Sequence, residues 1–167
     1  MNWLRYTPQH KRRFAVGSAL FLGLVFLISG VAKLPGQTDF AHALLRSFWN
    51  PAQVYLISHY LPWVETTWGL LLLVGIWPRF IAVLCIPLVF GFVANNSWAI
   101  INGISEFPEC ECFGVLEQYV GAFAPWEALV PDIFLLILAL VTMLLDQEGF
   151  FTFRPWFFLK QNRKIAP

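Results

Sequence analysis

Four long runs of apolar residues follow one another along the chain, and proline, glycine or charged residues separate them. Each run is long enough for a helix that crosses a hydrocarbon core of about 30 Å at a rise of about 1.5 Å per residue. We therefore predict an all-α fold, an integral membrane four-helix bundle with short interfacial segments. Residues 1–167 are predicted to form a single membrane domain. The predicted spans are Phe14 to Leu34, Pro51 to Ile76, Phe80 to Ile101 and Glu127 to Leu145.

The start of the second helix is inferred from its capping residues. The helix culminates in Val64–Ile76, and the purely apolar part of it is short. Asn50 precedes Pro51. Asparagine is a preferred N-cap, and proline suits the first helical position because the missing N–H would have no partner there. We expect Asn50 to cap a helix that begins at Pro51.

The composition supports a membrane location. The 167 residues are 58% hydrophobic and only 13% charged, whereas a soluble domain carries about 25% charged residues. The charges are segregated along the chain and do not cluster on one soluble face. We expect membrane lipid as a partner and no nucleic acid.

The distribution of lysine and arginine predicts the orientation. Nine of the eleven fall in the predicted N-terminal tail, the turn at Arg79 and the C-terminal tail, and only Lys33 and Arg46 fall toward the other face. Cytoplasmic loops carry the excess of these residues. We predict that both termini are cytoplasmic and that the segment around Cys110 faces outward from a bacterial cytoplasmic (inner) membrane. The basic aromatic tail at 150–167 and the mixed segment Asp39–Trp49 are predicted to lie along the membrane surfaces.

Charged residues inside a span cost a few kcal/mol, so each needs a reason. Lys33 ends the first predicted helix, and Glu65 lies about one turn inside the outer end of the second. Antiparallel helices bring them to one depth, where they either form a pair or a shared polar site, or reach interfacial water separately. Asp132, after Pro131, is the third candidate for an intramembrane functional site.

Other polar and small residues in the spans have structural interpretations. For Asn95 and Asn96 we expect hydrogen bonds between helices, with only one of the two facing inward. Cys85 is expected to be a buried small hydrophobe, and His42 and His59 are expected at the interface. We expect no metal site at these residues. A close-packing face is predicted on the first helix from Gly17, Ser18, Gly23, Ser29 and Gly30.

Cys110 and Cys112 are separated only by Glu111, in a loop before the last predicted helix. Three interpretations stay open: a redox-active disulfide, an inert local disulfide, and a metal site. A disulfide across one residue departs from relaxed geometry and is easier to reduce, which favours a redox role. The neighbouring glutamates disfavour a thiolate, and a structural zinc site needs two more ligands.

Three motifs resemble those of the MauE/DoxX group of four-helix membrane proteins, over roughly residues 14–146. They are SG-x-x-KL at Ser29–Leu34, LP-x-x-E at Leu61–Glu65 followed by Gly69 and Gly75, and C-x-CFG at Cys110–Gly114. The methylamine utilisation MauE branch has glycine where this chain has Glu111.

The resemblance implies a role in redox chemistry. It implies that MauE-type proteins help disulfide formation during methylamine dehydrogenase maturation, and that DoxX relatives act in sulfur-compound oxidation coupled to quinone or in redox homeostasis. It also implies that Cys110 and Cys112 are a redox pair and that Lys33 and Glu65 are the family's intramembrane polar positions. Quinone is the implied cofactor. The four-helix design is similar to vitamin K epoxide reductases, whose second cysteine pair this chain lacks.

Two functions follow from these patterns. We favour a non-catalytic subunit of a larger membrane redox or energy-transducing complex, with other membrane-protein subunits as partners. The alternative is a membrane thiol-disulfide oxidoreductase or maturation factor that forms disulfides in an exported redox partner. Whether the chain is an enzyme depends on which of these holds.

Overall fold

The computed structural model describes residues 9–103 and 125–145, and this part of the chain is helical without a strand. Five helices follow one another in it. They are α1 (Gln9–Lys33), α2 (Gln37–Leu45), α3 (Pro51–Val74), α4 (Pro78–Ile101) and α6 (Pro125–Leu145). The all-α prediction is confirmed. The predicted helix at Pro51 begins at that residue. Most of α2 falls within Asp39–Trp49, and the interfacial location of that segment stays a prediction.

The ends of α3 follow from local backbone chemistry. The Asn50 side chain accepts a hydrogen bond from the Gln53 backbone N–H, and the Gln53 side chain accepts one from the Asn50 N–H. This reciprocal capping box satisfies two N–H groups that a helix start leaves unpaired. At the other end Gly75 adopts a φ of 84°, a left-handed conformation that glycine accepts without strain. The predicted Asn50 cap is therefore confirmed.

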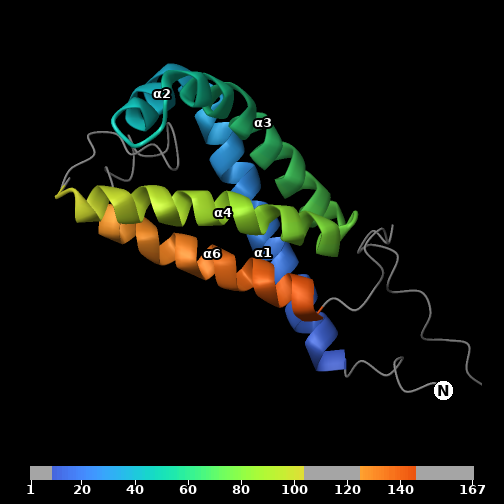
Figure 1. Cartoon of the computed structure of the whole chain (residues 1–167). Coiled ribbons are helices and arrows are strands. Elements are labelled where there is room, and N and C mark those ends of the chain that lie inside the picture. Colours follow the sequence, from blue (N-terminus) through green and yellow to red (C-terminus); the bar gives the residue numbers. More distant parts are fainter. Residues whose placement is uncertain (1–8, 104–124, 146–167) are drawn as a thin grey trace, which may run out of the picture.

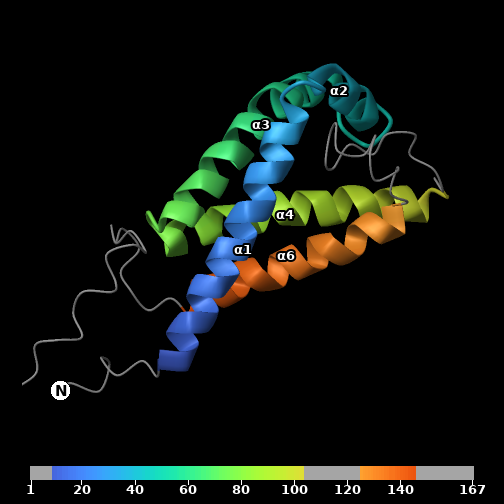
Figure 2. The ribbon, with the colours of Figure 1, turned by 180° about the vertical axis from the view of Figure 1, so that it is seen from behind.

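The long helices form two pairs. α1 packs along α3, α4 packs along α6, and α1 also contacts α6, whereas α3 and α4 touch little. The pairs cross, and they diverge toward the end that carries α2 (Figures 1 and 2). This divergence matters for the site, because α2 and the residues that follow it enter the space between the pairs.

Glycines on α1 permit the close approach of α3. A Cβ added to Gly30 would lie 2.6 Å from the backbone nitrogen of Thr66, and one added to Gly23 would lie 2.9 Å from the backbone oxygen of Gly69. Both glycines belong to the predicted close-packing face, which is confirmed for them. Gly17 was wrongly included, since a Cβ there meets nothing within 4 Å.

The main apolar core lies where the two pairs cross. Its buried members come from all four long helices: Ala19, Leu22, Phe26, Leu72, Ile81, Cys85, Val89, Leu135 and Ala139. Cys85 is fully buried among them, as expected of a small hydrophobe. A smaller cluster of Phe40, Leu44 and Val54 fastens α2 to the start of α3.

Three described helices are long and apolar enough to cross a membrane: Arg13–Lys33, Pro78–Ile101 and Trp126–Leu145. They correspond to the first, third and fourth predicted spans. The second predicted span coincides with α3, whose length is 24 residues but which is not among these candidates. Polar and amphipathic side chains, including Gln53, Ser58, His59 and Thr67, interrupt its apolar sequence. The count of four spans therefore stays a prediction, as does the cytoplasmic location of both termini. Cys110, Cys112 and the tail at 150–167 lie outside the described residues.

Candidate functional site

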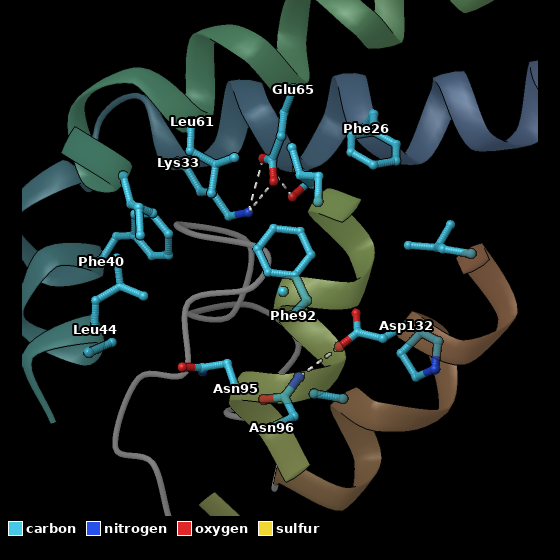
Figure 3. Close-up of a pocket in the computed structure, with 18 of the residues that line it drawn as sticks. Phe26, Lys33, Phe40, Leu44, Leu61, Glu65, Phe92, Asn95, Asn96 and Asp132 are labelled. Atoms are coloured by element: carbon cyan, nitrogen blue, oxygen red, sulfur yellow. Dashed lines mark hydrogen bonds and ion pairs between the residues drawn. The ribbon is translucent and has the colours of Figure 1, made fainter. Parts of the chain in front are cut away.

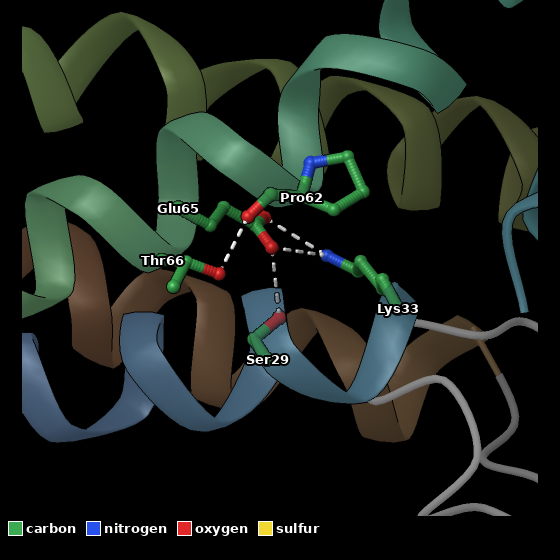
Figure 4. Close-up of polar contacts among 5 residues, drawn as sticks. All are labelled: Ser29, Lys33, Pro62, Glu65 and Thr66. Atoms are coloured by element: carbon green, nitrogen blue, oxygen red, sulfur yellow. Dashed lines mark hydrogen bonds and ion pairs between the residues drawn. The ribbon is translucent and has the colours of Figure 1, made fainter. Parts of the chain in front are cut away.

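A buried ion pair joins α1 to α3. Lys33 Nζ donates to both carboxylate oxygens of Glu65, at 2.8 Å to Oε1 and 2.9 Å to Oε2. The two residues are 1% and 0% exposed. Ser29, one turn before Lys33 on α1, donates to Glu65 Oε2 at 3.2 Å (Figure 4). Of the two alternatives for Lys33 and Glu65, the structure shows the pair.

The local sequence places this pair. Lys33 is the last residue of α1, and Ser29 lies four residues earlier, so both project from one face of the helix. The missing side chain of Gly30 lets the turn of α3 from Pro62 to Thr66 come against that face. Glu65 therefore meets the end of α1 without an intervening side chain.

Two aromatic rings complete the surroundings of the ammonium group. Lys33 Nζ lies 4.9 Å from the centroid of the Phe92 ring on α4 and 5.3 Å from that of Phe40 on α2. Both distances are within the range of about 6 Å over which a cation is attracted to a ring face. Lys33 thus contacts three other helices, and its ammonium group is paired with Glu65 and flanked by two aromatic rings.

A second polar pair joins α4 to α6. Asn96 Nδ2 donates to Asp132 Oδ2 at 2.7 Å, and both residues are buried. The expected hydrogen bond between helices is confirmed for Asn96. The other carboxylate oxygen of Asp132, Oδ1, makes no hydrogen bond to the described residues.

Asn95 also faces the interior, which corrects the expectation that only one of the two asparagines does. Its Oδ1 accepts from Ser47 Oγ at 2.6 Å and from Trp49 Nε1 at 3.1 Å. Ser47 and Trp49 belong to the connection between α2 and α3. Because this connection enters the space between the helix pairs, it supplies partners for a helix position that would otherwise face an open wedge.

Both polar pairs border one cavity of about 250 Å³ between the two helix pairs and α2. Figure 3 shows Lys33 and Glu65 on one side of it and Asn96 and Asp132 on another, with Phe92 between them. The rest of the lining is mostly apolar. Besides the polar residues Ser29, Lys33, Glu65, Asn95, Asn96 and Asp132, it includes Phe26, Phe40, Leu44, Trp49, Leu61, Phe92, Pro131 and Leu135.

This combination is typical of a site for a small apolar molecule with a few polar atoms. Ligand sites have mainly apolar and aromatic walls with a few placed polar groups, and volumes of about 300–1,000 Å³. At about 250 Å³, this cavity suits a compact ring and not a large ligand. It offers one remaining hydrogen-bond donor from Lys33 and an acceptor at Asp132 Oδ1.

The structure separates the other candidates from this site. His42 and His59 are exposed and do not line the cavity. His59 stacks on Tyr55 with ring centroids 6.1 Å apart. No group of three or more His, Cys, Asp or Glu side chains that could hold a metal ion occurs within residues 9–103 and 125–145.

An all-helical bundle with three apolar helices of membrane-crossing length, and with an ion pair sealed inside it, defines a multi-pass integral membrane protein. The sequence profile of methylamine utilisation protein MauE matches residues 11–145. The chain belongs to the MauE family. No curated protein and no solved structure gives a significant match to it.

Sequence reasoning found the charged members of the site and missed most of its walls. Lys33, Glu65 and Asp132 were recognisable because charge is rare in apolar helices. Phe40, Trp49 and Phe92 carry no such signal in a chain with 17 phenylalanines and eight tryptophans. The pairing of Ser47 and Trp49 with Asn95 depends on how the α2–α3 connection folds back, which no spacing in the sequence reveals.

Proposed function

We propose that this protein is a membrane maturation factor of methylamine utilisation, in which Cys110 and Cys112 exchange disulfides with an exported partner protein. The observation that carries the proposal is the mainly apolar cavity with its few polar groups, together with its position. It lies at the end of the bundle where α4 finishes and α6 begins, and the segment between those helices carries both cysteines. Coupled redox chemistry requires that a thiol pair can come near the small-molecule site.

Chain length permits the two to meet. Cys110 is seven residues beyond Gly103, the last described residue after α4. An extended chain spans at most about 3.6 Å per residue, so the backbone of Cys110 lies within about 25 Å of Gly103. Chain length therefore allows the cysteines to approach the cavity.

The exchange balances as follows. Two thiols of the exported partner lose two electrons and two protons and form a disulfide. The Cys110–Cys112 disulfide accepts these electrons and protons and becomes two thiols, through a mixed disulfide. Renewal of the disulfide requires a further two-electron acceptor.

A lipid-soluble quinone fits the cavity as that acceptor and would supply two-electron, two-proton chemistry when bound. The walls of Phe26, Phe92 and Trp49 suit a flat ring. Lys33 Nζ uses two of its three N–H donors on Glu65, which leaves one for an acceptor oxygen. Asp132 Oδ1 is placed to take or return a proton at the cavity wall.

The positive-inside pattern supports a bacterial cytoplasmic membrane location with the Cys110 segment outward. Nine of the eleven lysines and arginines favour the side of the termini. An outward thiol pair is where an exported partner would find it, and extracytoplasmic compartments are oxidising.

Replacement of both cysteines tests the exchange. In cells that grow on methylamine, Cys110→Ser/Cys112→Ser should leave the protein in the membrane and leave exported partner proteins reduced, as measured by thiol trapping and growth. Cys85→Ala is the matched control, since Cys85 is sealed in the core, and it should oxidise the partner normally. Normal partner oxidation in the double serine variant would overturn the proposal.

One observation favours a second function, that of a non-catalytic subunit in a membrane complex. The outward face of α3 exposes Tyr55, His59, Tyr60 and Trp63, and α3 is less apolar than the candidate spans. Such a face suits a protein neighbour better than lipid tails. Purification in a gentle detergent distinguishes the maturation factor from the complex subunit, because a free monomer with no stoichiometric partner would count against the subunit function.

A further inference from the structure

The orientation of the Asn95 carboxamide is determined by its neighbours. The indole N–H of Trp49 can only donate, so the Asn95 atom that faces it at 3.1 Å must be the oxygen. Ser47 Oγ donates to the same oxygen at 2.6 Å. The amide nitrogen, Nδ2, therefore occupies the other branch of the group, directed away from the α2–α3 connection.

That nitrogen has hydrogen-bonding capacity to spare. An asparagine amide carries two N–H donors, and Asn95 Nδ2 makes no hydrogen bond to the described residues. Asn95 is only partly buried and lines the cavity, as Figure 3 shows. Because most of the cavity lining is apolar, this donor is best satisfied by an acceptor atom on whatever occupies the cavity.

We infer that Asn95 is a specificity-determining residue that donates a hydrogen bond from Nδ2 to a carbonyl oxygen of the cavity ligand, with Trp49 and Ser47 as positioning residues. The inference rests on the proposed function, because it names the group by which that acceptor is recognised. Lys33 supplies a second donor to the cavity, so the ligand class is a compact ring with two acceptor oxygens. A hydrocarbon of the same shape would fill the cavity and leave the Asn95 and Lys33 donors unpaired.

Trp49 contributes through geometry. Without its N–H, the remaining partner is the Ser47 hydroxyl, which can donate or accept. The carboxamide could then turn over and place its oxygen toward the ligand. With the two orientations equally populated, the competent fraction is half and the apparent affinity falls about twofold.

Two probes of matched shape test this. The first is 2,3-dimethyl-1,4-naphthoquinone, whose blocked ring positions do not add thiols, and the second is 2,3-dimethylnaphthalene, which lacks the carbonyls. Binding to the full-length protein in lipid nanodiscs is measured by equilibrium dialysis against empty nanodiscs. The Cys110→Ser/Cys112→Ser background removes thiol chemistry, so the result does not depend on disulfide exchange.

Asn95→Asp keeps acceptor oxygens for Ser47 and Trp49 and removes the N–H donors. Asn95→Leu removes both the acceptor and the donors without adding a charge. Both variants should weaken binding of the quinone about five- to tenfold, the value of one hydrogen bond, and change binding of the hydrocarbon less than twofold. Trp49→Phe also alters the cavity wall and can weaken both probes, but it should weaken the quinone about twofold more than the hydrocarbon.

The remaining outcomes overturn the inference. Equal weakening of both probes would mean that Asn95 only holds the α2–α3 connection in place. Unchanged quinone binding in both Asn95 variants would place the carbonyl elsewhere, and the proposed disulfide exchange would still stand. If the quinone does not bind the protein with Asn95 intact, both the inference and the proposed quinone site are wrong. The disulfide exchange would then be tested by the partner-oxidation assay alone.

Discussion

Removal of one partner from the Lys33–Glu65 pair should destabilise the protein severely. Both side chains are sealed from solvent and joined by hydrogen bonds of 2.8 and 2.9 Å. Either Lys33→Met or Glu65→Leu leaves a single buried charge without a counter-ion, a change that costs about 3–5 kcal/mol. A folded protein has only about 5–15 kcal/mol of stability. The loss is therefore at least about a fifth of the total stability, and it can equal most of that stability in a marginally stable protein.

The double variant Lys33→Met/Glu65→Leu should recover most of that loss. An apolar pair of similar volume often replaces a buried ion pair at little cost, because the charges no longer have to be desolvated. Met in place of Lys33 can still pack against Phe92 and Phe40. We expect the sum of the two single-variant losses in unfolding free energy to exceed the loss in the double variant by about 3 kcal/mol or more. This is a large coupling energy for two residues in direct contact.

Reversible unfolding in mixed micelles, followed by tryptophan fluorescence, measures these free energies. Arg46→Met is the control, since Arg46 is an exposed charge beyond the end of α2, and its replacement should change stability by less than about 0.5 kcal/mol. Additive single losses in the double variant, or single losses below about 1 kcal/mol, would refute the assignment of this pair as a sealed, mutually dependent unit.

Two further predictions concern the scaffold. Gly30→Ala should cost about 1–3 kcal/mol by overpacking the α1–α3 contact, because its Cβ would lie 2.6 Å from the Thr66 nitrogen, whereas Gly17→Ala, with nothing within 4 Å, should be neutral or stabilising in the same unfolding assay. Asn50→Ala should cost about 0.5–2 kcal/mol through loss of the capping box at α3. A larger loss for Gly17→Ala than for Gly30→Ala, or no effect at Asn50, would contradict these assignments.

The helices were predictable because their signals are local. Asn50 and Pro51 mark the start of α3 by chemistry that acts within one turn. Long apolar runs mark α1, α4 and α6 because few other structures satisfy the backbone in a hydrocarbon environment. The second span was harder to judge, since α3 mixes apolar residues with polar ones and owes its place to packing against α1.

The site was predictable only in its charges. Lys33 and Glu65 could be matched by depth alone, because antiparallel helices of known length bring their ends together. The choice between a pair and two separate snorkelling groups needed the distance between the axes, which Gly23 and Gly30 set. The inward orientation of both Asn95 and Asn96 depended on the wedge between the helix pairs, which gives partners to two adjacent positions on one helix.

Composition, the long apolar runs, the Asn50-Pro51 pair and the rare intramembrane charges were enough to predict a helical membrane protein, the cap of α3 and the candidate polar positions. Those features depend on neighbouring residues or on the surrounding bilayer, so they can be recognised from the sequence alone. Only the tertiary structure decided that the two helix pairs diverge, that α2 and Trp49 enter the opening, and that Lys33, Asp132 and Asn95 border one cavity. Contacts between residues far apart in sequence depend on crossing angles and close approaches, and these are properties of packed surfaces rather than of any single helix.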